Sequence, residues 1–343
     1  MRPLRRGNRV AVFVVALTAG LVLAACGGDP EEPADENPDA QSVTSGTELT
    51  QTWPLTGLPV TGDDTAGQSH PVLVVKMDNT GGSAPQQGLD KADLVVEELV
   101  EGGVTRLAAF FYSAIPTETG PVRSMRASDI GIVAPVGATM VTSGAAAVTL
   151  ERISGAGIPY FSEGSPGFYR DSGRRAPYNL MTDLAETAKA ADLGKEVTPV
   201  DYLSWGTSED LPRGQKAKVI QASFSGGHTT YWRYKGGGYV NENSNADRDQ
   251  PFPTDTVLVL RVQVGDAGYK DPAGNFVPET ILEGTGEAML FHGGRLVRAT
   301  WSKASLDAPI ELSTVAGELK IPAGHTWIEL VPADGGEVTF AKK

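Results

Sequence analysis

Runs of apolar residues in the first half of the folded part predict strands of a sheet. Residues 93–100 and 104–114 are apolar on both faces, which is typical of strands buried in the middle of a sheet. Gly102 and Gly103 lie between these two runs and suit a hairpin connection, so the two strands are expected to pair antiparallel. Two shorter runs, at residues 71–77 and 138–142, predict further strands.

Three segments of the same half are predicted to be helices, at residues 122–134, 145–153 and 182–191. The first follows Gly120-Pro121, and proline is tolerated at the first helical position because its missing N–H would have no partner there. Strands that alternate with helices predict an α/β (α+β) N-terminal domain with a mixed sheet, over residues 53–194.

After residue 215 the pattern changes to short strands separated by glycine turns. Residues 257–264 alternate between apolar and polar positions, and residues 287–292 and 295–301 flank Gly293-Gly294, a strong hairpin signal. The sequence therefore predicts a smaller mainly-β C-terminal domain over residues 216–343. Residues 195–215 are polar and contain proline and glycine, so they are predicted to be a linker.

The start of the chain has the pattern of a signal peptide over residues 1–25. Four arginines precede the apolar run 10–23, which is too short for a transmembrane helix of about 20 residues. Leu23-Ala24-Ala25-Cys26 follows and resembles the lipobox of bacterial lipoproteins. In that class the cysteine thiol takes a diacylglyceryl group and the freed amine an acyl chain such as palmitate. An ordinary signal peptide with a chance cysteine is the alternative.

Cys26 is the only cysteine, which limits the chemistry of the chain. Once it is lipidated no thiol remains, so the sequence excludes disulfides, thiolate metal sites and a cysteine nucleophile. The four histidines are scattered without zinc spacing, and no Walker or dinucleotide motif is present. We therefore expect no metal and no cofactor.

The charge balance excludes nucleic acid as a partner. The net charge is −13, from 29 basic and 42 acidic residues; without the four signal-peptide arginines it is 25 against 42, or −17. Nucleic-acid phosphates require a basic face. Residues 26–52 contain seven acids and no Lys or Arg, which predicts a lipidated, disordered tether. The sequence thus predicts an exported protein, lipid-anchored to the outer face of the cytoplasmic membrane.

Several motifs together resemble the YerB family of bacterial lipoproteins. They are PLTGLP at 54–59, VVKMDN at 74–79, ADLVVE at 92–97, LVEGGVTR at 99–106, GPVRSMR at 120–126, RDS at 170–172, APYNL at 176–180, GEA at 286–288, TWSK at 300–303 and GHTWIE at 324–329. The resemblance implies two domains and an envelope lipoprotein, and it supplies no activity. Members often carry His where this chain has Tyr178, which argues against a His-dependent acid–base step there.

Arginines are the main candidates for ligand binding. Arg123 and Arg126 are three residues apart after the predicted helix start, where a helix N-terminus favours anions. Arg106 begins a strand, and Arg170 and Arg174 form a second cluster beside Asp171. An anion site is one interpretation of these five arginines. Structural pairing with nearby acids is the other.

Carboxylates form a second candidate group. Glu97 and Glu98 fall in a strand that otherwise looks buried, and a buried carboxylate is costly unless it is paired. A perturbed acid in a cleft is a functional candidate. Asp171, which follows Arg170, and Asp93 are two further possible acids. The structural alternative is that Glu98 pairs with Arg106 or Arg123.

The sequence favours a protein without enzymatic activity that recognises an anionic cell-envelope ligand or an envelope protein. A second hypothesis is an enzyme acting on a pyrophosphate-linked envelope glycan. The order of an acidic strand, a buried strand and an arginine-bearing helix start is loosely similar to the LytR-CpsA-Psr transferases, with Asp93 and Arg123 at the analogous positions. A third is a scaffold that binds only proteins.

Overall fold

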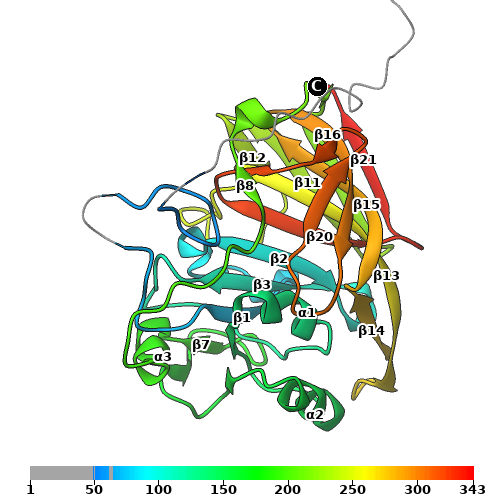
Figure 1. Ribbon diagram of the computed structural model, residues 1–343. Helices are drawn as coiled ribbons and strands as arrows, with labels where there is room; N and C mark the ends of the chain where they lie inside the picture. Colours follow the sequence, from blue (N-terminus) through cyan, green and yellow to red (C-terminus); the bar gives the residue numbers. More distant parts are fainter. Residues whose placement is uncertain (1–48, 50, 62–64) are drawn as a thin grey trace, which may run out of the picture. The chain divides into compact units, whose positions relative to one another are not determined.

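The computed structural model describes residue 49, residues 51–61 and residues 65–343 (Figure 1). The predicted signal peptide, Cys26 and nearly all of the predicted tether lie outside the described residues. Leu49, which falls within the predicted tether, packs against the core together with Trp53. The ordered contacts of the fold therefore begin a few residues before position 53.

The mixed sheet expected from the first half is confirmed. Strands β2 (Leu94–Leu99) and β3 (Thr105–Phe111) pair antiparallel, and β1 (Leu73–Asp78) pairs antiparallel with β3 on its other side. β4 (Thr139–Val141) then runs parallel to β1, and β5 (Tyr160–Phe161) parallel to β4. Every residue of β1 and β3 is buried, as strands with two covered faces require.

Strands from the second half extend the same sheet. β20 (Thr326–Pro332) lies between β2 and β13 (Thr256–Lys270) and is parallel to both. The main order is β18-β17-β16-β15-β13-β20-β2-β3-β1-β4-β5, with β14 paired to β13 and β9 to β16. The added strands are β9 (Gln215–Lys216), β14 (Phe276–Ile281), β15 (Gly284–His292), β16 (Arg295–Lys303), β17 (Glu311–Thr314) and β18 (Gly317–Glu318).

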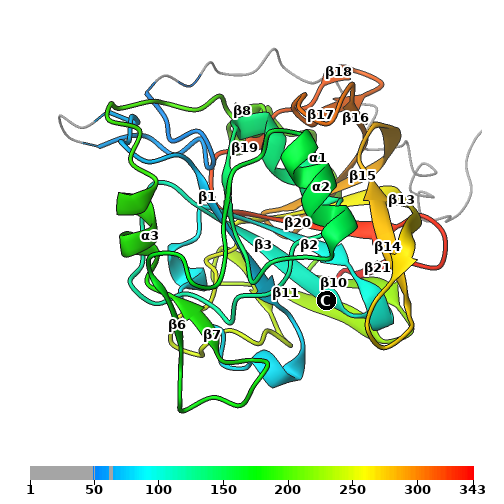
Figure 2. The ribbon, with the colours of Figure 1, turned by 90° about the horizontal axis from the view of Figure 1, so that it is seen from below.

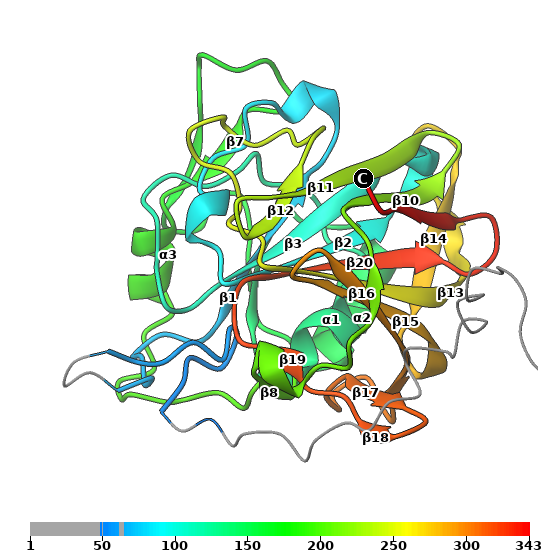
Figure 3. The ribbon, with the colours of Figure 1, turned by 90° about the horizontal axis from the view of Figure 1, so that it is seen from above.

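A second, four-stranded sheet covers one face of the central strands (Figure 3). Its order is β12 (Gly238–Asn241), β11 (His228–Lys235), β10 (Val219–Ser225) and β21 (Glu337–Ala341). Two small pairs complete the strands: β6 (Phe168–Arg170) with β7 (Leu180–Thr182), and β8 (Trp205–Gly206) with β19 (Ile321–Pro322). The mainly-β character of the second half is confirmed.

The helices are α1 (Asp129–Val133), α2 (Ala147–Gly155) and α3 (Leu184–Ala190), with single 3₁₀ turns η2 (Gly81–Ser83), η3 (Leu89–Lys91), η4 (Glu101–Gly103), η5 (Ala134–Val136) and η6 (Ser208–Asp210). Helices α1 and α2 lie on the opposite face of the central strands (Figure 2), whereas Leu184 and Ala188 of α3 pack with the apolar residues on the side of the four-stranded sheet. The second and third predicted helices are thus confirmed, with shifted ends.

The predicted helix start at Pro121 is wrong. Val122 forms a bridge with Met77, its amide donates to the carbonyl of Leu180, and the amide of Arg123 donates to the carbonyl of Lys76. Because neighbouring strands take these amides, the segment stays extended and helix α1 begins only at Asp129. Among the described residues, no helix begins beside Arg123.

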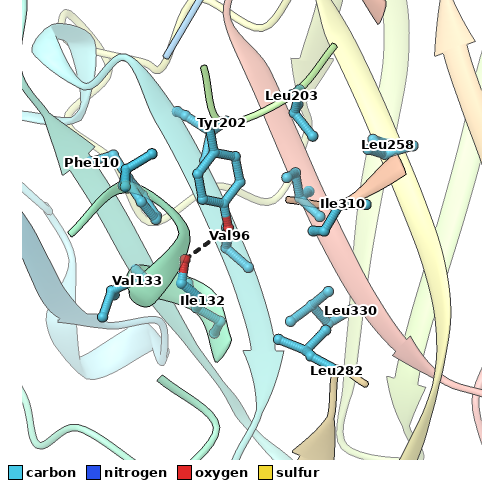
Figure 4. Close-up of a cluster of buried hydrophobic side chains, with 14 of the residues drawn as sticks. Val96, Phe110, Ile132, Val133, Tyr202, Leu203, Leu258, Leu282, Ile310 and Leu330 are labelled. Atoms are coloured by element: carbon cyan, nitrogen blue, oxygen red, sulfur yellow. Dashed lines mark hydrogen bonds between the residues drawn. The ribbon is translucent and has the colours of Figure 1, made fainter. Parts of the chain in front are cut away.

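Apolar side chains fill the spaces on both sides of the central sheet. On the helix side, Val96, Phe110 and Leu330 pack against α1 and against Tyr202 (Figure 4). The Tyr202 hydroxyl donates to the carbonyl of Ile132 at 2.9 Å, as the dashed line in Figure 4 shows. The segment 195–215, predicted to be a linker, therefore also contributes to the core. Each large apolar side chain buried in this way stabilises the fold by about 1.5–3 kcal/mol.

Candidate functional site

A buried ion cluster, formed by one residue each of β1, β2 and α1, lies on the helix-covered face of the central sheet. The Nζ of Lys76 lies 2.5 Å from Oε1 of Glu98 and 2.7 Å from Oδ1 of Asp129, and all three side chains are 0% exposed. Burial raises the pKa of Glu98; Lys76 opposes that shift and Asp129 adds to it. The cluster joins the central sheet to α1.

The partner expected for Glu98 was wrong. Glu98 stands opposite Arg106 in the register of β2 and β3, yet its carboxylate bonds Lys76, two strands away. Lys76 stands opposite Ala108 on the intervening strand. Because Ala108 is small, we infer that the lysine side chain can pass over it to reach Glu98.

Three of the five candidate arginines lie near one another, and two of them, Arg106 and Arg126, share Glu101. Arg106 Nη2 lies 3.1 Å from Glu101 Oε1, and Arg126 Nε donates to Glu101 Oε2 at 2.9 Å. Arg123 bonds Asp78 at 3.0 Å and stacks over the ring of Tyr178. Burial, followed by repulsion from Arg126, lowers the pKa of Arg106 to about 10.

The charges of this region balance. Its four cations and four anions are Lys76, Arg106, Arg123, Arg126, Asp78, Glu98, Glu101 and Asp129. Each of the three arginines therefore has a carboxylate partner. The three arginines lie close together, as expected of an anion site. Each of them is also paired with an acid, as expected of a structural network.

Arg170 and Arg174 lie elsewhere. Arg170 pairs with Glu163 at 2.6 Å on an exposed hairpin. Arg174 pairs with Asp171 at 3.2 Å and donates to the carbonyl of Pro85 at 2.6 Å. The five arginines thus do not border a single space.

Asp93 fixes the far end of β3. Its carboxylate accepts the amides of Tyr112 at 2.6 Å and Ser113 at 3.0 Å, together with the Ser113 hydroxyl. Burial raises the pKa of Asp93, and the bonds from Ser113 oppose that shift. Asp93 lies five residues before Glu98, about 16 Å along the strand. Asp93 and Arg123 therefore do not form one site, which contradicts the arrangement expected by analogy with the LytR-CpsA-Psr transferases.

A second carboxyl pair, Glu97 with Glu329, lies on the opposite face of the sheet. The two residues are neighbours in the register of the parallel strands β2 and β20, and both are 0% exposed. Glu97 Oε1 lies 2.8 Å from His228 Nε2, and the Trp232 indole donates to Glu329 Oε1 at 2.6 Å. The pair connects the central sheet to β11.

The pKa values of the two carboxyl groups are shifted in opposite directions. Burial raises the pKa of Glu329 well above its usual value, and the charge of Glu97 adds to this shift. Burial also acts to raise the pKa of Glu97, but the hydrogen bond and charge of His228 outweigh it and lower that pKa. The environment therefore favours the protonated form of Glu329 and the ionised form of Glu97 beside His228. The sequence did not identify Glu329 as a candidate, because no pattern in the neighbouring residues indicates that it lies beside Glu97.

A pocket of about 450 Å³ opens beside the arginine group. Arg126, Ala146 and Lys270 border it, and helix α2 begins at its wall without a side-chain cap. The β13–β14 hairpin forms the other wall and is attached to α2. Tyr269 bonds Thr149 at 2.9 Å, and Glu279 accepts from Arg152 Nη1 at 2.7 Å.

The described residues contain neither a candidate metal cluster nor a membrane-spanning helix. No three His, Cys, Asp or Glu side chains gather there in an arrangement that could hold a metal ion. No helix in the described ranges has the length and apolar character needed to cross a membrane.

Comparisons with known proteins identify relatives of the whole folded part. Residues 55–196 match the family described as "Protein of unknown function (DUF3048) N-terminal domain", and residues 214–328 match its C-terminal domain. The chain is 27% identical over 295 residues to "Putative lipoprotein YerB" of Bacillus subtilis (strain 168), covering 81% of this chain and 86% of the relative.

A crystal structure of YerB protein from Bacillus subtilis has a similar fold. The TM-score is 0.70 at 23% identity, and the alignment covers 84% of this chain and 99% of that chain. Both family matches and the curated relative agree with the motifs found in the sequence. The chain belongs to the YerB family, whose members combine the N- and C-terminal DUF3048 domains.

Proposed function

We propose that this protein is exported and held by lipid on Cys26 at the outer face of the cytoplasmic membrane. The basic start, the short apolar run and the lipobox-like Leu23-Ala24-Ala25-Cys26 support this. The name of the Bacillus subtilis relative, "Putative lipoprotein YerB", is in line with it. Two acyl chains anchor stably where one gives marginal binding.

At that surface the protein recognises an anionic envelope ligand, and the pocket beside Arg126 is where it binds. One observation carries this assignment: the uncapped start of α2, Arg126 and Lys270 border the same space. The first amides of a helix have no partner within the helix and carry a partial positive charge. Such a helix end favours a phosphate or carboxylate.

The two acids of this pocket have partners of different kinds, since only Glu101 is paired with cations and Asp271 keeps its negative charge. Glu101 is shared between Arg106 and Arg126. Asp271 accepts the backbone and side-chain N–H groups of Asn275 at 2.8 and 3.0 Å. Lys270 contacts only the ring of Phe276 among the interactions of the described residues. The lysine and the helix start thus provide the positive potential.

Binding without chemistry is the role that fits this arrangement. The neighbouring carboxylates are held by arginines, and Asp93 lies at the other end of the sheet. A protein scaffold is the second candidate, favoured by the acid partner found for each of the five arginines. An enzyme acting on a pyrophosphate-linked glycan would need a free acid or base, which these groups do not provide.

A substitution at the start of α2 tests the pocket. Ala146 is the exposed N-cap residue and has extended backbone angles (φ −62°, ψ 150°), which suit a capping side chain. We expect Ala146→Asp to stabilise the fold by about 1 kcal/mol, because it caps the helix. The same charge would lower the affinity for inorganic pyrophosphate and for a polyprenyl pyrophosphate at least tenfold, by about 1.4 kcal/mol or more.

Ala146→Ser is the matched control, since it caps the helix without charge and should retain most of the affinity. Calorimetric titration gives the affinities, and urea unfolding gives the stabilities. If the parent protein shows no saturable binding of either anion, or if Ala146→Asp binds like the parent, the anion site is wrong and the scaffold is favoured.

A further inference from the structure

A separate pocket of about 510 Å³ lies among segments of the second half. Three stretches border it: the connection after η6, the turn from β11 to β12, and the turn from β15 to β16. The basic residues Arg213, His292 and Arg295 line it, and no Asp or Glu does. In a chain with a net charge of −13, a pocket without an acidic wall is an unusual local environment.

The two arginines of this pocket differ from those of the first half. Arg106, Arg123 and Arg126 each have a carboxylate within 4.0 Å. No ion pair joins Arg213 or Arg295 to a carboxylate in the part of the chain that the structure describes. Two guanidinium groups that share a pocket without counter-charge repel each other, and a bound anion removes that repulsion.

The backbone holds both arginines in place. Arg295 Nη1 donates to the carbonyl of Arg213 at 3.0 Å, and Arg295 stands opposite Lys216 in the β9–β16 pair. Gly214 has φ +61°, and a Cβ there would lie 2.5 Å from the carbonyl oxygen of Leu296. Only glycine allows this close approach of the loop to β16. The loop therefore holds Arg213 against the strand that carries Arg295.

The remaining lining groups suit a ligand with a polar head and a compact body. Ser208 and Tyr234 supply hydroxyl groups, and Leu211, Pro212 and Val297 supply apolar surface. Gly237 and Gly293 occupy the two turns, and a Cβ at either would meet no atom within 4 Å. The pocket is open at these turns and large enough for a small molecule, since such sites span about 300–1,000 Å³.

We propose that this pocket binds the phosphate group of a phosphorylated, sugar-sized ligand through Arg213 and Arg295. A phosphate has three oxygens for the two guanidinium groups and the nearby hydroxyls, and arginine binds such oxyanions in bidentate geometry. The apolar wall and the Tyr234 ring pack against the body of the ligand. This site is distinct from the Arg126 pocket and does not depend on that pocket being occupied.

Calorimetric titration of the full purified chain with glucose 1-phosphate tests the proposal. We expect saturable binding that weakens with salt, and weaker binding of glucuronate, whose carboxylate offers two oxygens. Glucose, which has no charge, should not bind. Arg213→Gln and Arg295→Gln should each reduce the affinity at least about tenfold, as the loss of a charge-assisted contact predicts. Both side chains are exposed, so the urea midpoint should stay unchanged.

Arg298→Gln is the matched control. Arg298 lies on the same strand, is paired with Glu287 and does not line the pocket, so its replacement should leave the affinity unchanged. Ala146→Asp should likewise bind glucose 1-phosphate as the parent does, which separates this site from the pocket of the proposed function. Absence of saturable binding by the parent at millimolar ligand, or equal affinity of Arg295→Gln and the parent, would overturn the proposal.

Discussion

Replacing Lys76 by methionine should be among the most damaging single changes to this fold. Lys76, Glu98 and Asp129 are all 0% exposed, and Nζ contacts both carboxylates at 2.5 and 2.7 Å. Methionine keeps most of the volume and removes the charge, so two buried carboxylates lose their cation. Breaking a buried ion pair in this way costs about 3–5 kcal/mol. Since domains of ordinary stability have about 5–15 kcal/mol in total, the variant should be close to unfolding.

Urea unfolding of the parent and of Lys76→Met measures this loss directly. Lys91→Met is the control, because Lys91 pairs with Asp90 at 3.0 Å but is 56% exposed, and such surface pairs contribute about 0–1 kcal/mol. A triple variant, Lys76→Met with Glu98→Gln and Asp129→Asn, removes all three charges together. It should regain much of the stability, since neutral groups are far cheaper to bury. A loss below about 1 kcal/mol for Lys76→Met, or no recovery in the triple variant, would refute this account.

Two further predictions concern the other carboxyl pair and the anchor. Folded Glu329 keeps a proton that the unfolded chain loses above its ordinary pKa of 4.5, so this group's contribution to stability declines as pH rises from there. In the parent protein, the free energy of unfolding should therefore fall as pH rises. In Glu329→Gln this fall should be less steep by up to about 1.4 kcal/mol per pH unit, and the remaining fall is due to His228. A pH series of urea melts with the same slope for both proteins would contradict it. Cys26→Ala should release the protein from membranes, and its full retention after a high-salt wash would rule out lipid anchoring.

Local sequence patterns were sufficient to predict those strands whose buried residues follow one another in the chain. The runs at 93–100 and 104–114 are apolar on both faces and became the central pair β2 and β3. The insertion of β20 beside β2 was not predictable from them, because strand partners far apart in sequence are set by packing. The helix expected after Pro121 failed for a related reason, since Leu180 and Lys76 take the amides of that segment.

The candidate site was predicted in part. The sequence named Arg106, Arg123 and Arg126 as candidates, but it did not indicate that Arg106 and Arg126 share Glu101 while Arg123 pairs with Asp78. Arg213 and Arg295 were missed altogether. Their pocket is assembled from three segments that are separated by dozens of residues, and neither arginine stands in a motif.

The place of β20 has a consequence for how the protein reaches its native state. This strand ends at Pro332 and lies in the middle of the main sheet, with β2 on one side and β13 on the other. A chain that emerges from its N-terminus during synthesis presents β2 long before β20, so the sheet stays incomplete until residues 326–332 have emerged. Until then β2 has an open edge, which can pair with other chains. Such long-range pairing also slows folding, so the emerging chain stays exposed to proteases and chaperones for longer than a protein built from local contacts.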